Sequence, residues 1–139
     1  MGGRWVFRLG LLGLMLAACT SPTQLAPIEV IEIRSGEGQS AVAGEALPDP
    51  IVARVLREDG SVAAWLLRLH MPGAGELDLG NAQAIGENVM FNSPNRDSTS
   101  VTWTLGPEVG EQLLRFFAVD LDGDTIETTV TAQALAPPR

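Results

Sequence analysis

Apolar and polar residues alternate along this chain in short runs that are separated by turn-forming residues. The runs are rich in Val, Ile, Leu, Thr and Trp, lie between clusters of Gly, Pro, Asn and Asp, and lack the 3.6-residue period of an amphipathic helix. The pattern predicts an all-β fold, an antiparallel β-sandwich of about seven strands. The expected strands are Ile28–Arg34, Ile51–Glu58, Val62–Met71, Ala84–Phe91, Thr99–Leu105, Glu111–Asp120 and Thr125–Ala134.

The same alternation assigns a core face to each strand, because successive side chains of a strand point to opposite sides of the sheet. Arg115 and Glu127 mark the outer faces of the last two runs. Strands of this number and patterning suit an immunoglobulin-like sandwich, and the alternation places Trp65 in its core. The predicted core also contains Leu67, Leu69, Met71, Leu114, Phe116, Ala118, Ile126, Val130 and Ala132.

One outer face carries more apolar side chains than solvent exposure requires. Leu113, Phe117 and Val119 share this face with Arg115. A partly apolar outer face can be a contact surface for a partner, and it can equally be a face that loops cover. The three residues are therefore candidates for a contact site.

The first residues have the order of an export signal. Two arginines precede a short apolar run, and small residues stand just before the single cysteine. The run is far shorter than the ~20 residues of a transmembrane helix. Leu16-Ala17-Ala18-Cys19 resembles the bacterial lipobox; the alternative is an ordinary secretory signal with an incidental cysteine. The resemblance implies cleavage before Cys19, lipidation of its sulfur and attachment to a membrane through the acyl chains.

These features divide the chain into four parts. We expect a lipoprotein signal peptide over 1–18, a lipidated Cys and polar tether over 19–27, the sandwich over 28–134 and a tail over 135–139. The expected location is the cell envelope. By the sorting rule known for lipoproteins, Thr20 after the cysteine favours the outer membrane if the organism is Gram-negative.

Several separated motifs resemble the bacterial Ig-like domain of group 1, the invasin and intimin type. They are SGEGQSAVAGEALPDP over 35–50, a strand that ends in Asp59-Gly60, and TWTLGP over 102–107 followed by Gly110-Glu111-Gln112. The resemblance covers about 28–134 and implies that Trp103 lies in the sandwich core. It also implies a surface-displayed module for binding or structural contact. Domains of this family usually occur in tandem as spacers, whereas this chain has room for one.

Charge and cysteine content narrow the range of partners. Removal of Arg4 and Arg8 with the signal leaves seven cations, all arginine, against 17 carboxylates, a formal net charge of −10. Nucleic acid is therefore not an expected partner, and an anionic lipid surface would repel the domain. A single cysteine cannot form an internal disulfide, so the domain must be held together by packing.

The sequence lacks the parts of the common reaction centres. His70 is the only histidine, so a catalytic triad or a zinc site would have to include it, and we expect an exposed histidine on a strand. Asp120, Asp122 and Asp124 form a weak calcium candidate, but the glycine stands in fourth rather than sixth place and no Glu stands in twelfth. We expect a hairpin there, no cofactor and no enzymatic activity.

Two functions remain in view. The first is a lipid-anchored surface module that contacts an unknown protein or polysaccharide. The alternative is an accessory subunit of an envelope or secretion assembly, with a sheet edge or the Leu113, Phe117 and Val119 face docking a partner.

Overall fold

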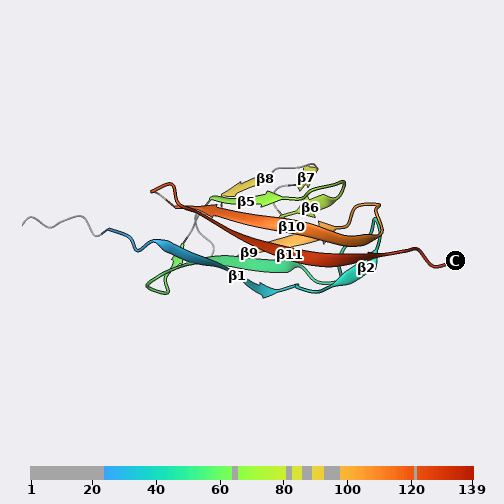
Figure 1. Ribbon diagram of the computed structural model, residues 1–139, viewed down its shortest axis with the longest axis horizontal. Helices are drawn as coiled ribbons and strands as arrows, with labels where there is room; N and C mark the ends of the chain where they lie inside the picture. The colour runs from blue at the N-terminus through green and yellow to red at the C-terminus, as the bar shows by residue number, and fades with distance from the viewer. Residues whose placement is uncertain (1–23, 64–65, 81–82, 86–88, 93–97, 121) are drawn as a thin grey trace, which may run out of the picture.

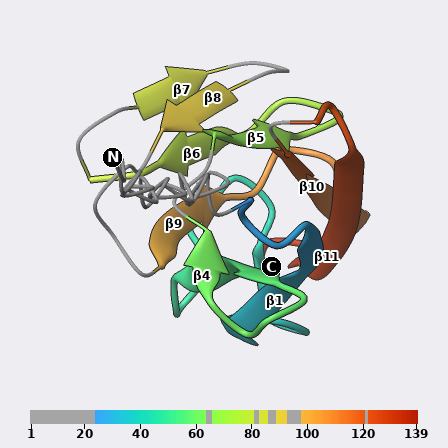
Figure 2. The same ribbon diagram turned by 90° about the vertical axis from the view of Figure 1, so that its left-hand side faces the viewer.

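The computed structural model describes residues 24–63, 66–80, 83–85, 89–92, 98–120 and 122–139. These residues form eleven strands and no helix, in two sheets that pack face to face (Figure 1). Figure 2 shows the sandwich from its end, with the sheets on either side of the core. The all-β sandwich predicted from the alternation is confirmed.

The strand order of the two sheets is that of an immunoglobulin-like sandwich. The first sheet has the order β1 (Ile28–Ser35), β3 (Ile51–Arg57), β9 (Thr99–Thr104), β6 (Glu76–Asp78) and β7 (Gln83–Ile85), with β4 (Val62–Ala63) beside β3. The second has the order β2 (Ser40–Val42), β11 (Thr125–Leu135), β10 (Gly110–Val119), β5 (Leu66–His70) and β8 (Val89–Asn92). In the standard lettering of immunoglobulin strands, β1, β3, β9 and β6 correspond to A, B, E and D, and β11, β10 and β5 correspond to G, F and C.

The prediction of one strand over Val62–Met71 is wrong. This run forms two strands in different sheets, because β4 pairs with β3 and β5 pairs with β10. Alternation of side chains is the same in one long strand and in two strands that change sheet, so the pattern alone could not reveal the crossing.

The run Ala84–Phe91 is also divided between the sheets. Strand β7 pairs with β6 in the first sheet, and β8 pairs with β5 in the second. The short strands β2 and β6 were not expected, since three residues are too few to show a period. Strand β2 runs parallel to β11, so the second sheet is not purely antiparallel.

The core lies between the sheets and largely matches the predicted one. Trp103 on β9 and Phe116 on β10 come from different sheets, and each has 0% of its surface exposed. Ile126 is partly buried and packs against the core, whereas Trp65 and the side chain of Leu67 lie outside the described part of the structure. The predicted core residues that are buried are Leu69, Met71, Trp103, Leu114, Phe116, Ala118, Val130 and Ala132.

The segment before β3 is held by the side chain of one glutamine. Gln39 donates from Nε2 to the carbonyls of Gly36 and Asp49, each at 2.8 Å, and accepts at Oε1 from the Asp49 N–H at 2.8 Å. Gly36 has φ of 93°, and a Cβ there would lie 2.7 Å from the Pro50 carbonyl oxygen. The SGEGQ motif and the Pro-Asp-Pro corner are therefore one folding unit.

A second glutamine holds the crossover from β9 to β10. Gln112 accepts at Oε1 from the Gly106 N–H at 2.8 Å, and its Nε2 donates to the carbonyls of Gly106 and Glu108 at 3.0 and 2.7 Å. Gly106 passes close to the backbone of Ala74, and a Cβ would lie 1.7 Å from that carbonyl oxygen. The TLGP and G-x-Q motifs thus stabilise the crossing between sheets.

Candidate functional site

The predicted lipidation site precedes the described part of the structure. Cys19 and the residues Leu16, Ala17 and Ala18 lie outside the described residues, which begin at Gln24. None of the described segments is a helix of the length and hydrophobicity that a membrane crossing requires.

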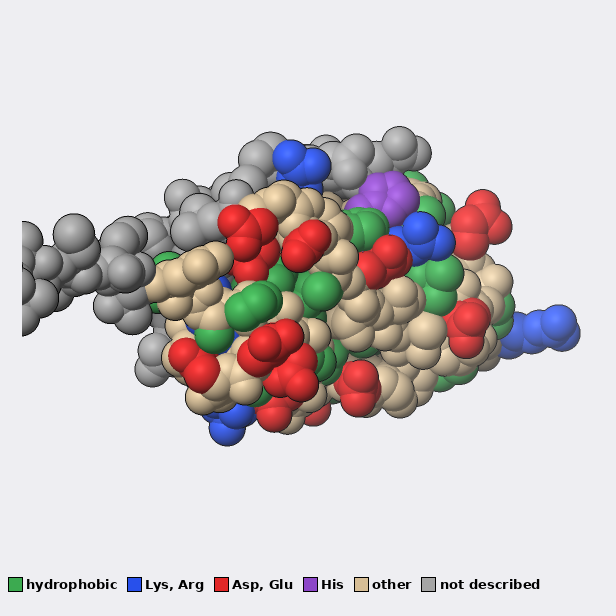
Figure 3. Space-filling model, turned by 60° about the vertical axis from the view of Figure 1, so that its left-hand side comes forward, with side chains coloured by type: hydrophobic (Ala, Val, Ile, Leu, Met, Phe, Trp, Pro, Cys, Tyr) green, Lys and Arg blue, Asp and Glu red, His purple; other side chains and the backbone are tan. Residues whose placement is uncertain are grey.

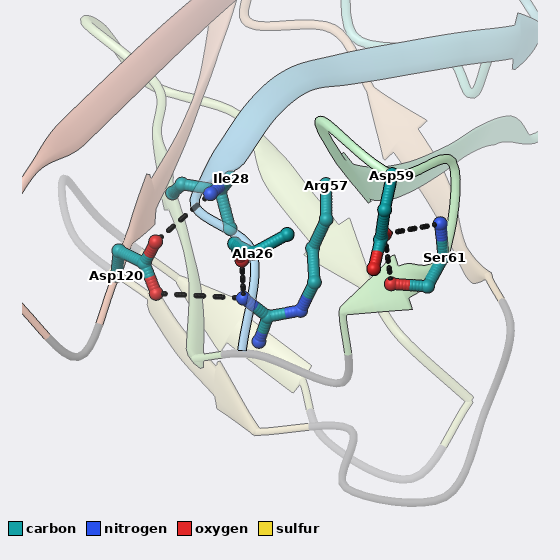
Figure 4. Close-up of polar contacts among 6 residues, drawn as sticks. All are labelled: Ala26, Ile28, Arg57, Asp59, Ser61 and Asp120. Atoms are coloured by element: carbon teal, nitrogen blue, oxygen red, sulfur yellow. Dashed lines mark hydrogen bonds and ion pairs between the residues drawn. The ribbon is translucent and has the colours of Figure 1, made fainter. Parts of the chain in front are cut away.

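The start of the first strand is fixed by a buried ion pair (Figure 4). Asp120 Oδ2 accepts a hydrogen bond from the Ile28 N–H at 2.8 Å, and Arg57 donates from Nη1 to the Ala26 carbonyl. Arg57 Nη1 also lies 3.7 Å from Asp120 Oδ1, and each of the two side chains is only 6% exposed. The chain is therefore tied to the ends of β3 and β10 where it enters the sandwich.

In this arrangement the Asp120 side chain is buried and lies apart from the exposed acids of the turn that follows it. Asp122 and Asp124 are exposed, whereas Asp120 is buried. The turn is the expected hairpin, with Gly123 at φ of 87° and the Asp120 N–H bonded to the Asp124 carbonyl at 2.8 Å. Among the described residues no three metal-ligating side chains gather, and the calcium candidate is not assembled.

The turn between β3 and β4 lies near the ion pair and is shaped by an exposed acid, also drawn in Figure 4. Asp59 Oδ1 accepts hydrogen bonds from the Ser61 hydroxyl at 2.6 Å and the Ser61 N–H at 2.9 Å. These bonds, that of the hydroxyl first, hold the pKa of the Asp59 carboxyl below its ordinary value. Gly60 supplies the positive φ that the turn requires, as the Asp-Gly pair predicts.

A groove of about 400 Å³ lies on the outer face of the second sheet, over β5, β10 and β11. The pairing of β5 with β10 sets Arg68 opposite Phe117 and His70 opposite Arg115. Residues directly opposite in an antiparallel pair have Cβ atoms about 4.5 to 5.5 Å apart, so these four side chains are neighbours. The groove is lined by Arg68, His70, Arg115, Phe117, Val119 and Thr125.

The three candidate contact residues are shared between this groove and a second hollow. Phe117 and Val119 line the groove, and both are half-buried. Leu113 is also half-buried, but it lines a hollow of about 220 Å³ beside Pro72 and Gln112. The three residues therefore share one side of β10, but Leu113 lines a different hollow from Phe117 and Val119.

The groove brings charged side chains of both signs together, because Glu127 of β11 lies opposite Phe117 and beside Arg115. Arg115 Nε lies 3.8 Å from Glu127 Oε1, with the side chains 43% and 45% exposed, so this pair is weak. Arg68 is exposed, and within the described residues it has no ion pair. Figure 3 shows the purple histidine of this face beside blue and green side chains, with red acidic side chains close to them and further red side chains elsewhere in the same view.

These groups suit recognition of a ligand. Guanidinium groups bind carboxylates or phosphates, and a half-exposed phenyl ring offers a flat apolar surface. The sequence predicted an exposed His70 but gave no reason to group it and Arg68 with Phe117. Only the register between β5 and β10 brings them together, and no local pattern encodes a register across about fifty residues.

No family model matches the sequence. A comparison with curated protein sequences also finds no match.

Solved structures with similar folds come from bacterial proteins. Domains 4 and 5 of the S-layer protein SbsC align with a TM-score of 0.55 and 14% identity over 78% of this chain and 53% of that one. The present chain thus spans about half the length of that S-layer structure. A conjugate transposon protein from Bacteroides vulgatus aligns with a TM-score of 0.54 and 13% identity, over 84% of this chain and 91% of the other.

A lipoprotein from Bacteroides thetaiotaomicron aligns similarly. Its TM-score is 0.53 and its identity 16%, over 84% of this chain and 87% of the other. At identities this low the likeness shows a shared fold, the β-sandwich described above.

Proposed function

We propose that the chain is a lipid-anchored lipoprotein of the bacterial cell envelope, which presents its sandwich for contact with another envelope component. The observation that carries this proposal is the placement of the two ends. The described chain begins at one end of the long axis and reaches its C-terminus at the other (Figure 1). A chain anchored through Cys19 would therefore hold the far end of the sandwich away from the membrane.

The ion pair between Arg57 and Asp120 supports this role. It fixes Ala26 and Ile28 to the body of the sandwich, so the direction in which the domain leaves its tether is defined. Only residues 20–25 separate that point from Cys19. At about 3.3 to 3.6 Å per residue this linker reaches at most about 22 Å, which keeps the domain near the membrane.

Two more specific roles fit the same placement. The motifs that resemble group 1 bacterial Ig-like domains favour a surface module. The alternative, an accessory subunit of an envelope assembly, is favoured by the shared fold with a conjugate transposon protein and a lipoprotein of Bacteroides. Both roles are non-catalytic and use the outer face of the second sheet for contact.

The anchoring is tested by replacing the predicted lipid-bearing residue. In cells fed labelled palmitate, the wild-type chain and the Asp122→Asn control should incorporate label and sediment with membranes. Cys19→Ala should incorporate none and accumulate as uncleaved precursor. Acylation and cleavage of Cys19→Ala at the same bond would refute the lipoprotein assignment.

A further inference from the structure

One row of side chains crosses the outer face of the second sheet at Phe117. Arg68 lies directly opposite Phe117 on β5, and Glu127 lies directly opposite it on β11. Neighbouring strands of a sheet are about 4.8 Å apart, so the two charged residues stand at equal distances on either side of the ring. The order along the row is therefore cation, aromatic ring and anion.

This row is complementary to itself under one particular symmetry. A face that packs on its own copy does so about a two-fold axis in the plane of the contact. An axis parallel to β10 through Phe117 places each Arg68 over the Glu127 of the other copy, and ring over ring. An axis across the strands instead places Arg68 over Arg68 and Glu127 over Glu127, and such like-charge contacts are disfavoured. The charges therefore select the axis that runs along the strand.

The position of the tether selects the same axis independently. Strands β10 and β11 run along the long axis of the molecule, and the chain enters the sandwich at one end of that axis (Figure 1). Rotation about an axis along the strands leaves both entry points at the same end, whereas rotation about the other axis puts them at opposite ends. With the far end held away from the membrane, one linker would then have to span the ten residues of β10, about 33 Å, which is more than six residues can reach.

We infer that the outer face of the second sheet binds a second copy of this chain, about a two-fold axis that runs along β10 through Phe117. The inference rests on the proposed function, since it names the component that this face contacts and uses the membrane anchor to orient it. The two rings pack at the centre of the contact, in the groove, and an Arg68–Glu127 pair lies on each side of them. An apolar centre surrounded by polar groups is the usual arrangement of a protein interface.

Two repulsive effects act on this contact. The net charge of the domain repels a second copy at a distance, but the Debye length at physiological salt is about 8 Å, so the groups that face each other decide the outcome. The axis also brings Arg115 near Arg115 of the second copy, although each already lies 3.8 Å from Glu127 of its own chain. Arg115→Gln should therefore strengthen the contact, and a weaker contact would contradict the assigned axis.

The contact is tested by co-purification of two differently tagged full-length copies, expressed together and extracted in detergent. Wild type should recover wild type. Arg68→Glu with itself, and Glu127→Arg with itself, should each recover at least about tenfold less, because like charges then face each other. Arg68→Glu expressed with Glu127→Arg should restore recovery, since opposite charges face each other again. Arg34→Glu, the same change at an exposed position of β1 in the other sheet, is the matched control and should behave like wild type.

A chemical crosslink identifies the pair of residues in intact membranes. The chain contains no lysine, so Arg68→Lys introduces the only one. A carbodiimide should join this amine to Glu127 of a second copy and give a product of twice the mass, which Arg34→Lys should not give. A product joined to a different protein would overturn the inference in favour of another partner. Failure of the mixed charge variants to restore recovery would overturn it as well.

Failure of the anchor and failure of the contact can be told apart. Cys19→Ala, extracted in detergent at matched concentration, should still recover a second copy, because the contact lies within the sandwich. Wild type that incorporates palmitate but recovers no second copy would refute the contact and leave the proposed anchoring intact.

Discussion

Asp120 follows the last residue of β10 and opens an acid-rich turn, yet its carboxylate is buried rather than exposed to solvent. The sequence shows Asp-Leu-Asp-Gly-Asp and gives the three acids the same apparent role. What separates them is Arg57, which lies 63 positions away and is buried at the same end of the molecule. A contact this distant along the chain leaves no local pattern, so the turn could be predicted and the ion pair could not.

Loss of the Asp120 charge should destabilise the protein strongly. Asp120→Asn leaves the Arg57 guanidinium buried without its counter-charge, and breaking a buried pair in this way costs about 3 to 5 kcal/mol. The thermal midpoint, followed by circular dichroism, should fall by about 10 °C or more. Asp122→Asn, at an exposed position two residues further on, should melt like wild type. Equal midpoints for the two variants would contradict the described role of Asp120.

Trp103 is the largest fully buried side chain, and its indole Nε1 has no hydrogen-bond partner among the described residues. Trp103→Ala should cost about 3 to 5 kcal/mol through the cavity it creates. Trp103→Phe should cost much less, because it keeps a ring and removes a buried polar N–H. Denaturant unfolding of both variants checks this order. Similar losses for the two variants would contradict it.

The strands that the alternation predicted best are those that stay in one sheet over their whole length. In β9, β10 and β11 the buried positions follow the predicted side almost without exception. The prediction failed for the middle of the chain, because the strands there are two to five residues long and successive strands belong to different sheets. Register and sheet membership depend on partners distant in sequence, which a period of two does not report.

The side chains of Gln39 and Gln112 connect segments that lie outside the long strands. Gln112→Ala removes three hydrogen bonds at the β9 to β10 crossover and should cost about 1 to 3 kcal/mol, since each bond contributes about 1 kcal/mol. Gln133→Ala makes the same change at an exposed position of β11 and should be nearly neutral. Hydrogen exchange should show faster exchange of the Gly106 amide in Gln112→Ala only. Unchanged exchange there would mean that Gln112 does not hold the crossover.

The molecule as a whole combines a chain start fixed at one end with a groove on the outer face of one sheet. The sequence predicted the sandwich and most of the core, and it pointed to one side of β10 as a contact face. It missed the groove, because the groove exists only where β5 and β10 pair in a particular register. The proposed lipid anchor near the start of the chain and the proposed contact on the outer face of the second sheet together describe a lipoprotein that contacts another envelope component.

Mass spectrometry of the mature protein, extracted from membranes with detergent, tests the proposed lipid anchor. We expect an N-terminal peptide that begins at Cys19 and carries a diacylglyceryl group on the sulfur, with residues 1–18 absent. A mature chain that begins elsewhere, or that has an unmodified Cys19, would contradict it.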